Sequence, residues 1–260
     1  MNATDEQLPV SRAVRPWVDR ISVAAYTGGD RCPLIHAPDP ATVLVWRTTA
    51  DGHSAVLVMG PRTHASYHDG KDIPVCVRFR IGPGSAPALL GVSAHEVVDR
   101  VVPLGELWGP SGYQLTDDLA GLGHDPALAV EILEAALLAR VDGEPAQERA
   151  RANLVREAAV ELSTDTARSP ARVGEVARRV GVSERQLRNV FTAGVGMPPK
   201  QFARLSRVRT LLGGAGRRSL AGLAGDAGYY DQWHMTAEFR EVMHVTPSAF
   251  FAGRLPSIPC

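Results

Sequence analysis

The sequence lacks the features that mark membrane, secreted or metal-binding proteins. It contains no apolar run of about 18 residues, so no segment is expected to span a membrane. Its first residues are polar and acidic, which predicts no secretory signal. The three cysteines, Cys32, Cys76 and Cys260, fit neither a disulfide framework nor the spacing of metal ligands. These absences predict a reduced, cytoplasmic protein.

Catalytic signatures are missing as well. The chain has no Gly-x-Ser-x-Gly nucleophile elbow and no glycine-rich phosphate loop with a lysine. Its histidines do not follow the order that a metal-binding β-barrel enzyme needs, and we interpret His64 and His68 as surface residues. We therefore expect no catalytic residues, no metal and no cofactor.

The net charge of zero conceals an uneven distribution along the chain. Residues 1–148 carry 11 Lys and Arg against 19 Asp and Glu, a net charge of −8. Residues 149–260 carry 17 against 9, a net charge of +8. A basic half predicts a polyanionic partner such as nucleic acid, with chance clustering on solvated helix faces as the alternative.

The basic half contains two copies of one pattern, over residues 173–202 and 220–250. Ala177 and Gly181 recur 47 residues later as Ala224 and Gly228. One inserted residue then changes the offset to 48. At that offset Ser183 pairs with Asp231, Leu187 with Met235, Phe191 with Phe239, Pro199 with Pro247 and Phe202 with Phe250. The repetition predicts two copies of one structural unit.

Each copy is predicted to form a helix, a tight turn and a second helix. In the first copy, apolar residues recur at helical spacing between Val173 and Val180. Gly181 suits a left-handed turn. Ser183 is placed to cap the next helix, with Gln186 three residues later as in a capping box.

The second helix of each copy carries polar residues opposite its apolar stripe. In a helix-turn-helix protein this helix enters the major groove, where Arg reads guanine and Asn or Gln reads adenine. The candidates for base reading are Arg185, Arg188, Asn189, Gln232, Trp233 and His234. A solvated amphipathic helix is the alternative for the set, and a core or interdomain position is the alternative for Trp233.

Residues 198–212, between the copies, predict one continuous helix with an apolar stripe. Such a helix would hold the two units at the fixed separation that adjacent turns of the major groove require. The candidates for contacts to DNA phosphates are Ser183, Lys200, Arg204 and Arg207.

The first half predicts strands followed by helices. Asp51-Gly52 lies between two apolar runs, which indicates a hairpin, and residues 75–81 alternate as a strand. Ser93 begins a capping box, and residues 125–140 predict a helix.

The aromatic candidates for an apolar ligand pocket are Trp46, Tyr67, Phe79 and Trp108, with core positions as the alternative. Cys32 and Cys76 are interpreted as buried structural residues, with reactive thiols as the alternative.

A long, ordered set of residues in the second half matches a known family. The set consists of Leu187 to Phe191, Gly196-Met197-Pro198-Pro199, Arg204-Leu205 with Val208, Leu211 and Leu212, and then Gly228-Tyr229 with Asp231 and His234, Phe239-Arg240, and Thr246-Pro247 before Phe250. The region from about residue 150 to 254 thereby resembles the DNA-binding domain of the AraC/XylS family of regulators. Residues 77–109 are similar to the N-terminal domain of one AraC-type subgroup. Trp233, Ala237 and His244 depart from the family pattern, which has a small residue, a basic residue and a glycine there.

The resemblance implies an α+β fold in two domains. A β-rich, sensor-like domain would occupy residues 1–141, a linker 142–149, and an all-α domain 150–260. The helix-turn-helix units would lie at about 172–193 and 219–241.

The implied function is that of a sequence-specific, DNA-binding transcription regulator modulated by a small-molecule effector at the N-terminal domain. The expected partners are double-stranded DNA, the effector and RNA polymerase, with no membrane; a homodimer is a further option. The charge asymmetry suggests that the acidic domain docks on the basic one and that a ligand alters this contact. The alternatives are an enzyme or small-molecule-binding module with a DNA-targeting C-terminal domain, and a protein that only binds other proteins.

Overall fold

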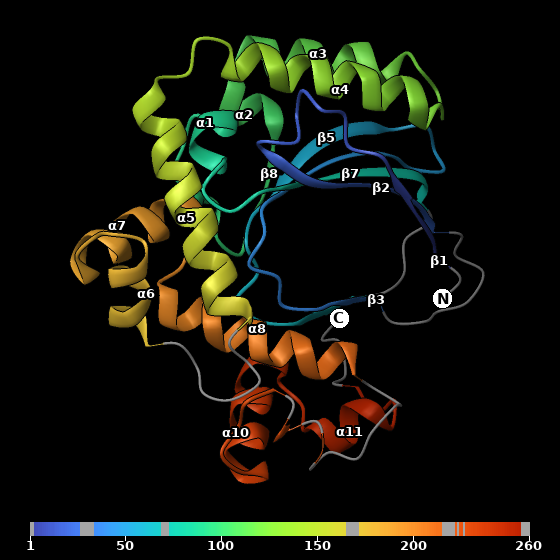
Figure 1. Cartoon of the computed structure of the whole chain (residues 1–260). Helices are drawn as coiled ribbons and strands as arrows, with labels where there is room; N and C mark the ends of the chain where they lie inside the picture. The colour runs from blue at the N-terminus through green and yellow to red at the C-terminus, as the bar shows by residue number, and fades with distance from the viewer. Residues whose placement is uncertain are drawn as a thin grey trace.

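The computed structural model describes residues 3–26, 34–68, 73–164, 172–214, 222, 224–225 and 227–255. The strands in these ranges are β1 (Ala3–Leu8), β2 (Val18–Tyr26), β3 (Leu34–His36), β4 (Val43–Thr48), β5 (Ser54–Met59), β6 (Ser66–His68), β7 (Ile73–Ile81) and β8 (Val101–Pro103). The helices are α1 (Ala86–Leu90), the 3₁₀ helix η1 (Ala94–Val97), α2 (Leu104–Trp108), α3 (Pro110–Ala120), α4 (Pro126–Val141), α5 (Ala146–Thr164), α6 (Val173–Arg179), α7 (Glu184–Val195), α8 (Pro199–Gly213), α10 (Gln232–Met243) and α11 (Pro247–Phe251). Sheet and helices thus precede a helical part, which confirms the predicted α+β class (Figure 1).

An antiparallel sheet with the strand order β1-β2-β7-β4-β5-β8 forms the centre of the N-terminal part. Strands β3 and β6 pair in a separate two-stranded sheet. Helices α3 and α4 cover one face of the large sheet, at the top of Figure 1. Trp46 of β4, Phe79 of β7 and Leu133 of α4 are fully buried in one core cluster. This cluster fixes the sheet against the helices.

The local sequence signals of the first half are confirmed. Strands β4 and β5 pair in register from Thr48 with Ser54, and Gly52 in their turn has φ +83°. Ser93 caps η1, with both hydrogen bonds of a capping box present. Asp125 caps α4 through the amides of Ala127 and Leu128. Each signal acts within a few residues, and the sequence therefore reveals it directly.

Helix α5 connects the two parts of the molecule. It begins at Ala146, so the second half of the expected linker over 142–149 is helical. Its side chains Val155 and Ala158 belong to the core of the C-terminal part. On another side, Arg156 donates hydrogen bonds to the backbone of Pro16 and, at 3.3 Å, to the Ser85 hydroxyl in the N-terminal part. The helix therefore packs with both parts.

Candidate nucleic-acid interface

The first helix-turn-helix unit is formed by α6 and α7. Gly181 has φ +74° in the turn, a conformation that a residue without Cβ adopts without strain. The Ser183 hydroxyl accepts a hydrogen bond from the Gln186 amide at 3.1 Å and so caps α7. Leu187 and Phe191 are fully buried beneath this helix. The cap and the two anchors fix the start and the rotation of α7.

The second unit repeats this geometry around α10. Gly228 has φ +72°, and Asp231 caps α10 by accepting from the His234 amide at 2.7 Å. The turn closes with the Tyr229 amide donating to the Ala224 carbonyl at 2.9 Å, as Val182 donates to Ala177 in the first unit. In the second copy the sequence places Leu220, Leu223 and Ala224 on the apolar face of the first helix, and Leu220 and Leu223 lie outside the described residues.

The two units also share the same aromatic packing. Phe191 of α7 meets Phe202 of α8 edge to face, with ring centroids 5.2 Å apart. At the equivalent positions, Phe239 of α10 meets Phe250 of α11 at 5.8 Å. Helix α8 is continuous from Pro199 to Gly213, as the sequence predicts, and its Val208 is buried in the common core. Within the described residues, the turn, the second helix and the aromatic packing of the two units are thus duplicated.

The outer face of α7 presents three of the predicted base readers. Arg185, Arg188 and Asn189 are all exposed, on the side opposite Leu187 and Phe191. Arg188 forms an ion pair with Glu184 one turn earlier. Such an exposed pair contributes only about 0.2–1 kcal/mol, so Arg188 can exchange Glu184 for a stronger partner.

The outer face of α10 presents the other three, Gln232, Trp233 and His234, which are exposed. Trp233 is 80% exposed and is not a core residue. The His234 Nε2 atom lies 3.3 Å from a carboxylate oxygen of Glu238 on the same helix. Tyr230, in the preceding turn, is 94% exposed and was missed by the sequence analysis. Its position directly before the Asp231 cap was the available signal.

The basic residues of α8 have different surroundings. Lys200 is exposed near the start of the helix. Arg204 donates to Glu241 of α10 at 2.8 Å, and Arg207 donates to both carboxylate oxygens of Glu238 at 2.9 Å. The hydrogen bond from Arg204 lowers the pKa of Glu241 below its ordinary value. Both arginines, expected as phosphate contacts, are thus engaged in ion pairs between α8 and α10.

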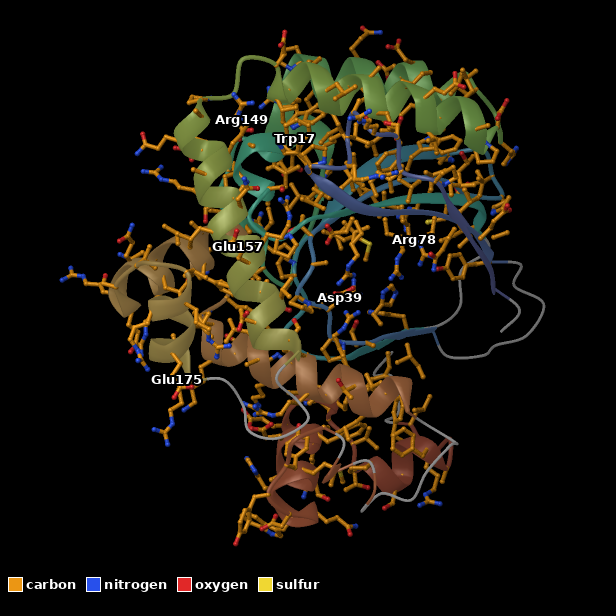
Figure 2. The ribbon with its side chains drawn as sticks, in the orientation of Figure 1. Trp17, Asp39, Arg78, Arg149, Glu157 and Glu175 are labelled. Carbon is orange, nitrogen blue, oxygen red and sulfur yellow. The ribbon has the colours of Figure 1, made fainter. Side chains whose placement is uncertain are left out.

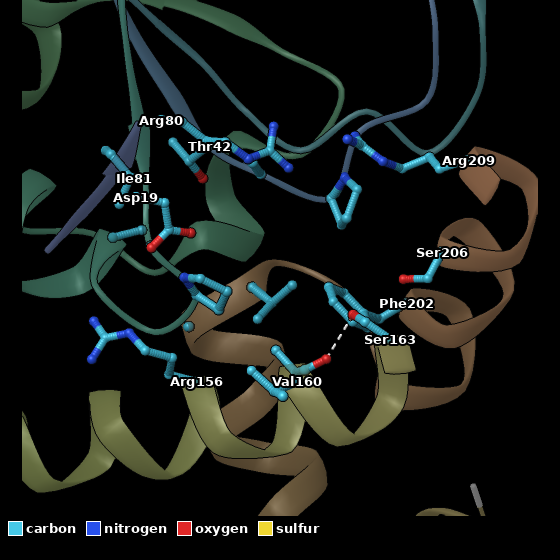
Figure 3. Close-up of a pocket in the computed structure, with 18 of the residues that line it drawn as sticks. Asp19, Thr42, Arg80, Ile81, Arg156, Val160, Ser163, Phe202, Ser206 and Arg209 are labelled. Carbon is cyan, nitrogen blue, oxygen red and sulfur yellow. Dashed lines mark hydrogen bonds between the residues drawn. The ribbon is translucent and has the colours of Figure 1, made fainter. Parts of the chain in front are cut away.

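A cavity of about 610 Å³ lies between the N-terminal part and the helix-turn-helix units (Figure 3). Its charged lining residues are Asp19, Arg80, Arg156 and Arg209. Its apolar lining includes Ile81, Val160, Val195 and Phe202. Burial raises the pKa of Asp19, against the opposing effect of the Arg156 and Arg80 charges. Asp39, beside the lining, pairs with both Arg80 and Arg209, so the cavity has an excess of one positive charge beside an apolar surface.

The four aromatic residues considered as pocket lining lie elsewhere. Trp46, Phe79 and Trp108 belong to the core of the N-terminal part. Tyr67 is half-buried and contacts the second helix-turn-helix unit. Of the cysteines, Cys76 is buried, whereas Cys32 and Cys260 lie outside the described residues.

Within the described ranges, no group of three or more His, Cys, Asp or Glu side chains is arranged to hold a metal ion. The helices that the structure describes include none that is long and apolar enough to cross a membrane.

Comparison with known proteins places the similarity in the helical part. Residues 176–253 match the model of a helix-turn-helix domain. An AraC-type transcriptional regulator from Chromobacterium violaceum is 24% identical, with a TM-score of 0.36, over 39% of this chain and 92% of that one. The DNA-binding domain of the global transcriptional factor AdpA, solved in complex with a target DNA, is 23% identical, with a TM-score of 0.34, over 40% and 90%.

Similarity over a longer stretch is more distant. ToxT from Vibrio cholerae O395 is 10% identical, with a TM-score of 0.44, over 92% of this chain and 99% of that one. No curated protein matches by sequence. The duplicated, capped and core-anchored units agree with the family match, and residues 176–253 of the chain are a helix-turn-helix domain.

Proposed function

We propose that this protein is a cytoplasmic transcription regulator that binds double-stranded DNA sequence-specifically under the control of a small molecule. One observation carries the proposal. Helix α7 is capped and anchored in the core, and it exposes Arg185, Arg188 and Asn189 on one face. These are the side chains that read guanine and adenine in the major groove. A second unit with the same arrangement follows the C-terminal end of α8.

In this proposal the residues that contact bases and the residues that contact phosphates have separate roles. The side chains of α7, with Gln232, Trp233 and His234 of α10, contact base edges and select the sequence. Lys200 and Ser183 contact phosphates and supply affinity that falls with salt. Arg204 and Arg207 act indirectly, because their ion pairs set the position of α10 on α8. A single chain can thus occupy two groove segments, with a homodimer and a contact to RNA polymerase as additions to this core activity.

Replacing Arg188 with alanine is expected to weaken binding to the specific site by about 1–3 kcal/mol, because a bidentate contact to a base is lost. Binding to random DNA should change little. Fluorescence anisotropy with a selected DNA site and with random DNA, at two salt concentrations, measures both affinities.

Two further variants complete this experiment. Lys200→Ala should weaken both DNAs to a similar degree and reduce the salt dependence, since it removes a phosphate contact. Arg149→Ala removes an exposed arginine at the start of α5, away from both recognition helices, and should leave both affinities unchanged (Figure 2). Equal losses on specific and random DNA for Arg188→Ala would refute base reading by this residue.

We further propose that the effector occupies the cavity between the two parts. Figure 3 shows the side chains of Arg80 and Arg209 extending toward one another along one edge of the cavity, where both pair with Asp39, and Arg156 on α5. Asp19 in the lining and Asp39 beside it, which pairs with Arg80 and Arg209, leave one of the three positive charges in excess. The matching ligand is a small organic anion with an apolar body, because a charge-assisted hydrogen bond to arginine contributes about 1.5–3 kcal/mol. A ligand there would contact both parts of the molecule at once.

A matched pair of probes tests the charge requirement. Phenylbutyrate and phenylbutanol share their apolar body and differ in the anionic group. Titration calorimetry should show binding of phenylbutyrate at least about tenfold tighter than of phenylbutanol, and Arg156→Met should remove that difference. Equal affinity for the two probes in the wild-type protein would count against an anionic effector.

A further inference from the structure

The C-terminal end of recognition helix α7 receives hydrogen bonds from the N-terminal part. The Gly84 amide donates to the Gly194 carbonyl at 3.2 Å, and the Ser93 hydroxyl donates to the Ala193 carbonyl at 3.3 Å. The His95 Nδ1 atom lies 3.2 Å from the carbonyl oxygen of Gly196. The last carbonyls of a helix have no partner within the helix and must find one elsewhere. Here residues around α1 and η1 of the N-terminal part supply it.

The C-terminal end of recognition helix α10 is capped in the same way. The Ala65 amide donates to the Val242 carbonyl at 2.8 Å. The Tyr67 hydroxyl donates to the Met243 carbonyl at 2.7 Å. Ala65 directly precedes β6 and Tyr67 lies within it, again in the N-terminal part. Ala65 is buried within the core cluster of the helical part, so this contact excludes water.

The two caps fall on equivalent positions of the sequence repeat. Gly194 and Val242 are separated by the repeat offset of 48, and each accepts from a backbone amide of the N-terminal part. Gly196 and His244 have the same separation, and both take the left-handed conformation that ends a helix, with φ +88° and +56°. The N-terminal part therefore contacts the C-terminal ends of both recognition helices at equivalent positions.

The packing around each cap is specific. A Cβ on Gly194 would lie 2.8 Å from the Gly84 Cα atom, so this approach requires glycine. In the second unit His244 occupies a left-handed position that favours glycine. Its ring stacks on the ring of His64, with centroids 5.3 Å apart and planes inclined by 13°. His244, which stands where the family has a glycine, thus gains a partner in the N-terminal part.

We propose that Gly84, Ser93, Ala65 and Tyr67 are positioning residues for DNA recognition. They cap both recognition helices from the N-terminal part and thereby set the distance and angle between α7 and α10. The inference rests on the proposed DNA-binding function. The cavity wall includes Pro83, Gly194 and Val195, directly beside the first cap. A ligand in the cavity therefore acts on the position of α7 relative to α10.

The consequence concerns the spacing of the two half-sites on DNA. Two recognition helices held at a fixed separation bind the second half-site at high effective concentration only when the spacing of the half-sites matches. The wild-type protein should therefore discriminate strongly between spacings. Loss of a cap should reduce this discrimination and leave the affinity of each half-site unchanged.

The test uses the full-length protein and a DNA site that it selects from a random pool. The site is rebuilt with one or two extra base pairs between its halves, and each half is also measured alone by anisotropy. The wild-type protein should prefer the selected spacing by at least about tenfold. The preference should fall below about threefold in the His64→Ala/Tyr67→Phe double variant and in Gly194→Ala. Tyr113→Phe, which changes an exposed tyrosine on α3, should keep the full preference.

Thermal unfolding of each variant accompanies the titrations. If Gly194→Ala fails to fold, the double variant alone decides, because it leaves every backbone position of the two units unchanged. A preference of tenfold that survives in a folded double variant would overturn the positioning role while the DNA-binding function stands. Failure of the wild-type protein to select any DNA would overturn the proposed function and this inference together.

Discussion

Replacing Asp39 with alanine is expected to lower the free energy of unfolding by about 3 kcal/mol, because it leaves two arginines without their counter-ion. Arg80 of β7 donates to both carboxylate oxygens of Asp39, at 2.6 and 2.8 Å. Arg209 of α8 pairs with the same carboxylate from the helical part. The Asp39 side chain is 15% exposed, in the middle of the molecule (Figure 2). One carboxylate therefore links the two parts.

The loss of stability in the Asp39→Ala variant should depend on pH in a defined direction. Burial raises the pKa of Asp39, but the hydrogen bonds and charge of Arg80 and the charge of Arg209 outweigh it and leave the pKa below its ordinary value. A carboxyl with a depressed pKa stabilises the folded state above its ordinary pKa of about 3.9, and this contribution disappears as the pH falls through the folded-state pKa. Urea unfolding should therefore show the full difference between wild type and variant at pH 7 and a shrinking difference below about pH 4.

Asp117→Ala provides the matched control, since Asp117 is exposed on α3. It should change the stability by no more than about 0.5 kcal/mol at either pH. Arg209→Ala should cost less than Asp39→Ala, because Arg80 keeps its bidentate partner. A loss for Asp39→Ala that stays constant between pH 7 and pH 3 would contradict the assigned role of its charge.

The elements that the sequence predicted correctly are those whose cause is local. Gly181 and Gly228 have the positive φ that their turns need, and Ser183 and Asp231 cap the helices that follow. The repeat located both units because equivalent core positions require the same kind of side chain. The exposed face of α7 followed from the buried positions of Leu187 and Phe191, since helix geometry relates the two.

The features that were missed depend on contacts between distant segments. Arg204 and Arg207 resemble phosphate contacts on their own helix, and only the packing of α10 brings Glu241 and Glu238 to them. Trp46, Phe79 and Trp108 have the composition of a pocket, yet the sheet and helices close around them as core. The general docking of an acidic domain on a basic one was suggested by the charges. The ion pair between Asp39 and Arg209, one of the contacts between the two parts, was not identifiable without the fold.

Arg207→Met is expected to lower the free energy of unfolding by about 3 kcal/mol and to weaken binding to specific and random DNA alike. The Arg207 and Glu238 side chains are 13% and 15% exposed, so removal of the guanidinium leaves a largely buried carboxylate without its arginine partner. The guanidinium also lies 5.3 Å from the Tyr229 ring centre, which ties it to the turn before α10. The second unit should therefore lose its position on α8. Urea unfolding and anisotropy measure the two effects.

The double variant Arg207→Met/Glu238→Leu separates the structural role from a contact to DNA. Replacing a buried ion pair by apolar side chains of similar volume is often neutral or stabilising, so stability should return close to that of the wild type. If Arg207 only positions α10, DNA affinity and its salt dependence return as well. If Arg207 instead neutralises a phosphate, the stable double variant still binds DNA weakly, and the slope of log K against log salt is smaller by about 0.9. We expect the first result, because both carboxylate oxygens of Glu238 already hold the guanidinium within the protein.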